Sequence, residues 1–94
     1  MLAYILMKVP AKHLEGVLQQ LKDFPGVVEA CVIYGETDII AQIQVPNQTE
    51  LDELVLKRIQ DIPEVESTRT FIGVGGMHWR RETNAVKDAV APAI

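Results

Sequence analysis

The hydrophobic residues of this chain fall into short blocks whose spacing changes between two periods. Four blocks are short, rich in β-branched residues and bounded by turn formers, and they are predicted as strands: 3–9, 27–34, 38–45 and 65–74. Within 39–45 the odd positions are all apolar, while the even positions are Ile40, Gln42 and Gln44. This alternation is typical of a strand with one buried face and one mixed face.

The two blocks between these strands have helical spacing. The first lies between Pro10 and Pro25–Gly26, and its apolar stripe is Leu14, Val17, Leu18 and Leu21. Gly16 lies inside this helix, which suggests that another backbone approaches it closely. The second helix carries the stripe Leu51, Leu54, Val55, Ile59 and Ile62, and it ends before Pro63. Thr49 is its expected N-cap, with Asp52 in the capping-box position.

The predicted order is β-α-β-β-α-β. The simplest fold for this order is an α+β, ferredoxin-like sandwich, in which two helices cover one face of a four-stranded antiparallel sheet. The other face then has no cover, and its expected residues are more apolar than solvent normally contacts: Tyr4, Leu6, Ile40, Gln42, Thr70 and Ile72. A second copy packed sheet to sheet would bury them, so we expect at least a dimer.

The character of the chain changes after Val74. Gly75–Gly76 are expected to form a flexible link. The spacing of four later residues permits a short helix: Ala85, Val86, Ala89 and Val90. We therefore divide the chain into a domain of residues 1–74 and an extension of residues 75–94. This extension either docks on a neighbour through Trp79 or forms a mobile tail.

Charge and composition exclude several classes of function. Thirteen acidic residues against nine basic ones give a net charge of −4, which argues against direct binding of nucleic acid. The N-terminus shows no cationic leader, and no apolar run reaches the roughly 20 residues of a membrane helix, so we expect a cytoplasmic protein without membrane contact. The single cysteine, Cys31, excludes an internal disulfide and is expected to be a small core residue.

Residues that would indicate catalysis are sparse. His13 and His78 lie far apart in the sequence and are both expected at the surface. No cysteine or histidine pair has metal-ligand spacing, and "GVGG" at 73–76 lacks the residues of a phosphate loop. We therefore expect no enzyme activity, no cofactor and no metal. Because small dimeric oxygenase-type enzymes share this α+β topology, they remain a third alternative.

Two short motifs permit both a structural and a functional interpretation. In "YGETDII" at 34–40, Gly35 suits a hairpin turn, and Glu36 and Asp38 are either turn acids that face water or groups that recognise a ligand. In "STRT" at 67–70, Thr68 and Thr70 point to one face of a strand, where threonine is also a common structural residue.

Taken together, these motifs resemble a known family. "PGVVEA" before the second strand, "YGETDII" as a G-x-x-D hairpin and "IPEVESTRTFI" before the last strand are similar to the ligand-binding (RAM) domain of the Lrp/AsnC, or feast/famine, transcriptional regulators. The resemblance covers about residues 3–74. Family regulators also carry an N-terminal helix-turn-helix, and this chain starts at the first strand, so it resembles the stand-alone RAM proteins.

The resemblance implies an assembly and a site. Family members form dimers through their sheets and then rings, often tetramers of dimers, and they bind a free amino acid where dimers meet. Carried over to this chain, the implied ligand-binding residues come from the hairpin of one subunit and the last strand of a neighbour: Tyr34, Gly35, Glu36, Thr37 and Asp38, with Thr68 and Thr70.

The main hypothesis is therefore a stand-alone, amino-acid-binding oligomer that senses a small molecule or modulates full-length Lrp/AsnC regulators by mixed assembly. The alternative is a structural or scaffolding oligomer with a vestigial pocket and a tail that recruits a partner.

Overall fold

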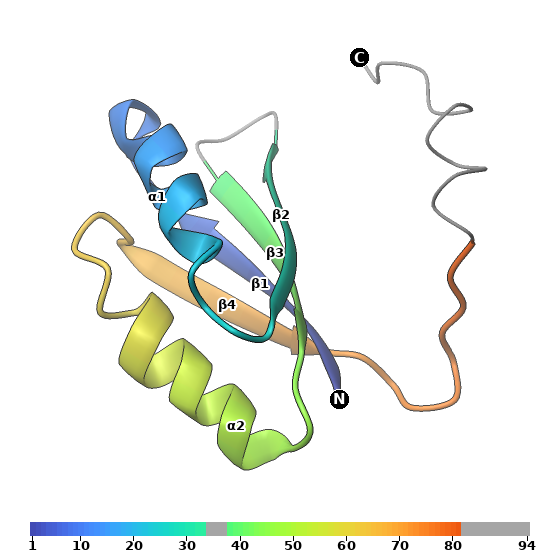
Figure 1. Ribbon diagram of the computed structural model, residues 1–94. Helices are drawn as coiled ribbons and strands as arrows, with labels where there is room; N and C mark the ends of the chain where they lie inside the picture. Colours follow the sequence, from blue (N-terminus) through green and yellow to red (C-terminus); the bar gives the residue numbers. More distant parts are fainter. Residues whose placement is uncertain (34–37, 82–94) are drawn as a thin grey trace.

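The computed structural model describes residues 1–33 and 38–81. In the described part, four antiparallel strands form one layer, and two helices pack as a second layer on one of its faces (Figure 1). The elements are β1 (Leu2–Lys8), the 3₁₀ turn η1 (Ala11–His13), α1 (Leu14–Leu21), β2 (Val27–Ile33), β3 (Asp38–Gln44), α2 (Gln48–Asp52), its π-helical continuation η2 (Glu53–Ile59) and β4 (Ser67–Ile72). The predicted ferredoxin-like α+β fold is confirmed.

The sheet has the strand order β2-β3-β1-β4, so β1 is central and pairs with both β3 and β4. Lys8 lies opposite Asp38 on one side and Ser67 on the other, and Tyr4 lies opposite Gln42 and Phe71. Because directly opposed residues in an antiparallel ladder point to the same face, these pairings assign the residues of β1, β3 and β4 to the helix side or to the open side of the sheet.

The helix side holds the core. The alternate residues Ala3, Ile5 and Met7 of β1 are fully buried, as are Ile39, Ala41 and Ile43 of β3. The helices contribute residues that the helical spacing predicts: Val17, Leu21, Leu51, Leu54, Val55 and Ile59 are buried, and Leu14 and Leu18 pack against them. Ile62, the last residue of the predicted stripe, is also buried but lies beyond the end of η2. Each fully buried aliphatic side chain contributes roughly 1.5–3 kcal/mol to folding.

The first helix lies between Pro10 and Pro25–Gly26 as predicted, but it is shorter than expected, since α1 ends at Leu21. Pro10 precedes η1, and the carbonyl of Pro10 accepts a hydrogen bond from His13 N at 2.9 Å. The chain then turns into β2 at Gly26, whose φ of 103° lies in the region that favours glycine. Gly16 differs from the expectation, because no other group lies within 4 Å of the position that a Cβ would take.

The N-cap expected for the second helix was wrong by two residues. Asn47, not Thr49, has an extended backbone, and its Oδ1 accepts a hydrogen bond from Glu50 N at 2.9 Å. Asp52 accepts a hydrogen bond from the side chain of Gln48 at 2.9 Å instead of closing a capping box. The helix begins at Gln48, directly after Asn47, and asparagine is a strong N-cap.

The open face was predicted correctly for the inner strands and wrongly for β4. The register places Tyr4 and Leu6 of β1 and Ile40 and Gln42 of β3 on this side, as expected. Thr70 and Ile72 instead lie opposite Ile5 and Ala3, on the helix side, and the open side carries Phe71 and Arg69. In "STRTFI" neither set of alternate residues is clearly the more apolar. The sequence therefore does not show which set faces the helices.

Cys31 is not a core residue. It lies opposite Ile40 on the open side of β2, and its side chain is exposed. β2 is an edge strand with a register shift between Val27 and Glu29, which weakens its alternation. The four residues expected to form a helix after Arg81 (Ala85, Val86, Ala89 and Val90) lie outside the described residues.

Two glycines should respond to alanine in opposite directions. Gly16→Ala should raise the free energy of unfolding by up to about 1 kcal/mol, because alanine is the better helix former and the site is open. Gly26→Ala should lower it by about 1 kcal/mol or more, because of its positive φ and because the new Cβ would lie 3.0 Å from Val45 Cγ1. Urea denaturation measures both, and equal shifts for the two variants would contradict the assignment.

The capping assignment has its own test. Asn47→Ala should lower the free energy of unfolding by about 1 kcal/mol, because the backbone N–H of Glu50 loses its hydrogen-bond acceptor. Thr49→Ala is the matched control and should change stability by less than about 0.5 kcal/mol. Thermal denaturation measures the stability of both variants. A larger loss of stability in Thr49→Ala than in Asn47→Ala would mean that Thr49 is the N-cap after all.

Candidate functional site

The predicted site combines a hairpin tip with the last strand. Four of its residues, Tyr34, Gly35, Glu36 and Thr37, lie outside the described residues. The strands that carry this tip are described, and Ile33, the last residue of β2, lies opposite Asp38, the first residue of β3. The predicted β2–β3 pairing on either side of the tip is therefore confirmed.

Asp38 is the best-defined residue of the hairpin half. Only 5% of its surface is exposed, although it is charged and follows directly on the tip. It lies on the open side of the sheet, opposite the exposed Lys8 of β1. A turn acid that faces water, the structural interpretation of this residue, does not describe Asp38. Among the described residues no buried side-chain oxygen lacks a hydrogen-bond partner, so the burial of Asp38 does not by itself assign it a role.

The threonine half lies on the other side of the sheet. Thr68 and Thr70 lie opposite Met7 and Ile5, so their side chains point to the helix side of β4. Thr68 Oγ1 accepts a hydrogen bond from Gln60 Nε2 at 2.8 Å, and Thr70 is exposed. The two threonines share a face, as the alternation predicted.

The threonines line a groove between β4 and the second helix. Its volume is about 300 Å³, and its other lining residues are Gln48, Leu51, Asp52, Val55, Leu56, Gln60 and Ile72. In η2 the hydrogen bonds have π-type spacing, as Gln60 N donates to Val55 O at 3.0 Å. Gln60 follows this segment, lines the groove and donates its side-chain hydrogen bond to Thr68.

Gln60 is the groove residue that the sequence did not indicate. It directly follows Ile59, the last residue of the buried stripe within the helix, and one exposed polar residue after a helix gives no signal of its own. Only the bond across to Thr68 makes it part of the groove.

The structure does not bring the two halves of the predicted site together within one chain. Asp38 points to the open side from β3, and Thr68 and Thr70 point to the helix side from β4, with β1 between them. Because opposite faces of a sheet do not share a pocket, a site that uses both sets of residues needs residues from two chains.

Other chemistry is limited in the described residues. Residues 1–33 and 38–81 contain no group of three or more histidine, cysteine or acidic side chains that is placed to hold a metal ion. His13 lies next to α1 and His78 beyond β4, and they do not meet at one site. Within the same residues, no helix has the length and apolar composition to cross a membrane.

Comparison with known proteins identifies the class of this chain. Residues 2–75 match the family model described as the Lrp/AsnC ligand binding domain, and the chain belongs to this family. The resemblance read from the three sequence motifs is therefore confirmed.

Particular relatives show how far the similarity extends. The chain is 39% identical over 72 residues to the HTH-type transcriptional regulator FL11 of Pyrococcus horikoshii, which covers 77% of this chain and 47% of that protein. The structure of E. coli AsnC superposes with a TM-score of 0.78 at 24% identity, covering 86% of this chain and 55% of the other. The regulator NMB0573 from Neisseria meningitidis, solved as an L-Met complex, superposes with a TM-score of 0.72 at 17% identity, covering 90% of this chain and 58% of the other.

The chain thus spans about half the length of the curated relatives it matches. These relatives are transcriptional regulators, and the family is regulatory rather than enzymatic. This confirms the expectation that the chain is not an enzyme and argues against the oxygenase-type alternative.

The two threonines should differ in their effect on stability. Thr68→Val removes the hydroxyl that accepts the hydrogen bond of the Gln60 side chain. We expect it to lower the free energy of unfolding by about 1 kcal/mol. Thr70→Val removes an exposed hydroxyl from a strand, where valine is at least as favourable, and should change stability by less than about 0.5 kcal/mol. Chemical denaturation measures both, and a larger loss for Thr70→Val would mean that its hydroxyl has a structural partner.

Proposed function

We propose that this chain binds a free amino acid, or a similar small molecule, in a pocket that two copies form together. The observation that carries the proposal is the position of the predicted site residues on opposite faces of one sheet. Membership of a family of ligand-binding domains supports a small-molecule ligand. The L-Met complex of NMB0573, a structural neighbour, is the reason to test amino acids first.

The residue chemistry suits a zwitterion. In this proposal the Asp38 carboxylate accepts hydrogen bonds from the ligand ammonium, and its burial strengthens such a charge-assisted bond. Backbone N–H groups near Gly35 hold the ligand carboxylate, and the hydroxyl of Thr70 from a neighbouring chain completes the polar set. Gly35 enters here only through the family resemblance.

The open sheet face favours a homodimer. Tyr4, Leu6 and Phe71 contribute apolar surface to it. Its exposed charges are segregated, because the acid Glu29 lies on the outer strand β2, whereas the bases Lys8 and Arg69 lie on β1 and β4. A two-fold axis parallel to the strands would place the acidic half of one sheet over the basic half of the other.

Contacts between such dimers would then bring a hairpin from one dimer to the threonines of the next, which requires a higher ring such as a tetramer of dimers. The same contacts would allow mixed assembly with full-length relatives of the FL11 type and a regulatory role in the cytoplasm. In this proposal the chain senses a metabolite, and the bound metabolite acts on other regulators by changing how the chain assembles with them.

Calorimetry with the assembled protein is the direct test. Titration with the twenty amino acids, L-methionine first, should give saturable binding for at least one of them. Asp38→Asn and Thr70→Val should each weaken binding tenfold or more, which corresponds to the loss of one charge-assisted or buried hydrogen bond of about 1.5 kcal/mol.

Matched controls separate the site from general effects. Asp61→Asn and Thr49→Val make the same chemical changes at exposed positions elsewhere and should leave the affinity unchanged. If an assembled protein binds none of the twenty amino acids, the sensor proposal fails and the scaffolding alternative takes its place.

A further inference from the structure

The segment Val74–Arg81, called here the C-terminal arm, has a surface that the described part of the chain does not cover. We propose that the arm of each chain clasps the open sheet face of a second copy, with Trp79 and Met77 as apolar anchors and Arg80 beside Glu29 of that copy. The proposal rests on the sheet-to-sheet dimer of the proposed function.

The arm turns toward the open side of the sheet. At its base Gly73 N donates to Leu2 O at 2.7 Å, and a turn follows in which Met77 N donates to Val74 O at 3.2 Å. His78 then shares a hollow of about 160 Å³ with Leu2 and Gln44, which belong to the open side. Figure 1 shows this segment in orange, on the side of the sheet opposite to the helices.

The arm exposes large apolar side chains. Val74, Met77 and Trp79 are 67%, 82% and 75% exposed. The guanidinium of Arg81 lies 5.3 Å from the centre of the Trp79 ring, a cation–π contact that orients both side chains. Tryptophan and arginine dominate the energetics of many protein interfaces, so this pair has the composition of a docking element.

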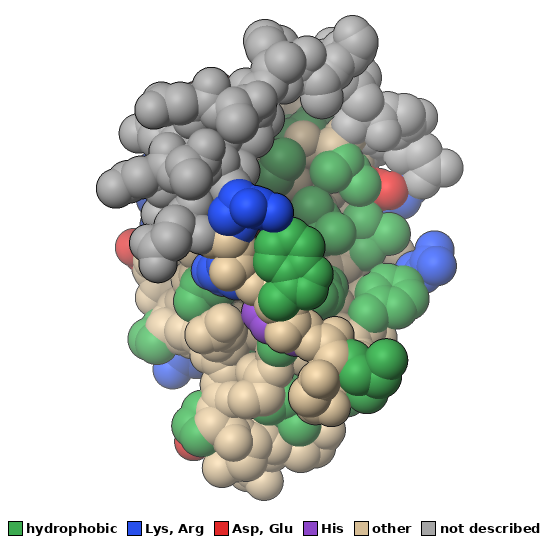
Figure 2. Space-filling view, turned by 90° about the vertical axis from the view of Figure 1, so that its right-hand side faces the viewer, with side chains coloured by type: hydrophobic (Ala, Val, Ile, Leu, Met, Phe, Trp, Pro, Cys, Tyr) green, Lys and Arg blue, Asp and Glu red, His purple; other side chains and the backbone are tan. Residues whose placement is uncertain are grey.

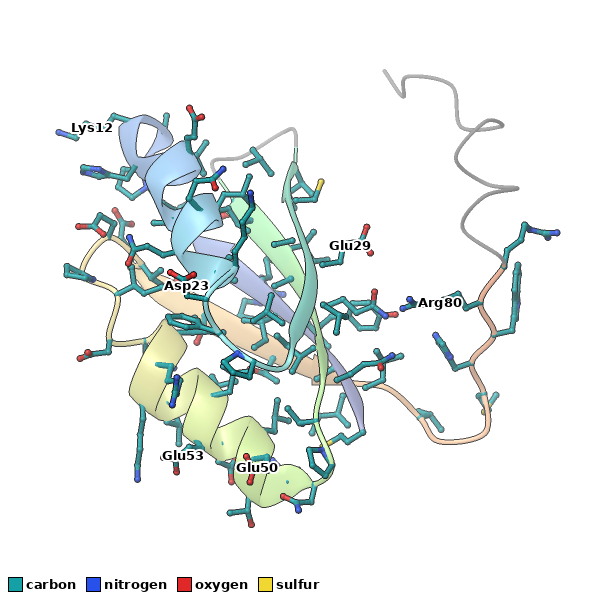
Figure 3. The ribbon with its side chains drawn as sticks, in the orientation of Figure 1. Lys12, Asp23, Glu29, Glu50, Glu53 and Arg80 are labelled. Carbon is teal, nitrogen blue, oxygen red and sulfur yellow. The ribbon has the colours of Figure 1, made fainter. Side chains whose placement is uncertain are left out.

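The charge of the arm matches the open face of a second copy. Arg80 and Arg81 are adjacent cations in a chain with a net charge of −4. Glu29 is an exposed acid on the open side, at the outer strand β2. In Figure 3, Glu29 projects from β2 to the side on which the arm lies, and Arg80 projects from the arm back toward the sheet.

Three points favour a second copy over the arm's own sheet. The arm already lies on the open side of its own chain, yet Met77 and Trp79 remain largely exposed there. Figure 2 shows hydrophobic side chains gathered on this same face. The two-fold axis that pairs the acidic and basic halves would also place the start of the partner's β2, with Glu29, across from the end of β4, where the arm begins.

Sedimentation equilibrium of the full chain tests the anchor. Trp79→Ala should raise the dimer dissociation constant tenfold or more, because it removes a central aromatic anchor. Val32→Ala is the control, since Val32 is an exposed apolar residue on the helix side of β2, away from both the open face and the groove beside β4. It should leave the dimer dissociation constant unchanged.

A charge exchange tests the ionic contact. Arg80→Glu and Glu29→Arg should each weaken the dimer several-fold, and the double variant should recover most of the loss because the pair is restored with reversed signs. Arg58→Glu makes the same change on the helix layer and serves as the control. If the double variant dimerises no better than the weaker single one, the Arg80–Glu29 contact is wrong.

The outcomes distinguish the clasp from the dimer itself. A dissociation constant that stays unchanged or falls in Trp79→Ala overturns the clasp and leaves the sheet-to-sheet dimer intact; a fall would mean that the arm shields its own sheet. A wild-type chain that remains monomeric at all concentrations overturns the dimer, and the clasp with it.

Discussion

The central strand β1 is the constraint on which the rest of the structure depends. Its alternate residues Ala3, Ile5 and Met7 are fully buried under the helices, and a slip of one residue would exchange them with Tyr4 and Leu6. Since β1 pairs with both β3 and β4, the burial of these side chains also determines which residues of β3 and β4 face the helices. Asp38 therefore points to the open side, and Thr68 and Thr70 point to the helix side.

The assignment of these residues to the two faces of the sheet has a functional consequence. Asp38 and the two threonines lie on opposite faces of one sheet, so in the proposed function ligand binding depends on assembly. A ligand held between two chains binds the assembled state better than the separated one and shifts the population toward it. Such linkage is a physical basis on which a small domain can report the concentration of a metabolite to regulators of its own family.

The strength of the local pattern decided how much the sequence could predict. The inner strands and both helices were predictable because their apolar residues have a single period and are buried on one side. The edge strands were not: "STRTFI" has no apolar phase, and β2 carries a register shift, so the faces of Thr70, Ile72 and Cys31 were predicted wrongly. Membership of the family was predictable from motifs. The separation of Asp38 from Thr70 follows from long-range register and could be seen only in the folded chain.

A complementation experiment tests the central claim, that one pocket uses two chains, most directly. Asp38→Asn and Thr70→Val chains are unfolded, mixed in equal amounts and refolded together, and the ligand sites are counted by calorimetry. If the pocket lies between chains, random assembly pairs an intact hairpin with an intact threonine strand at about a quarter of the sites, and these bind with wild-type affinity. If mixing restores no high-affinity site although the chains co-assemble, the pocket does not combine Asp38 and Thr70 from two chains, and the account is wrong.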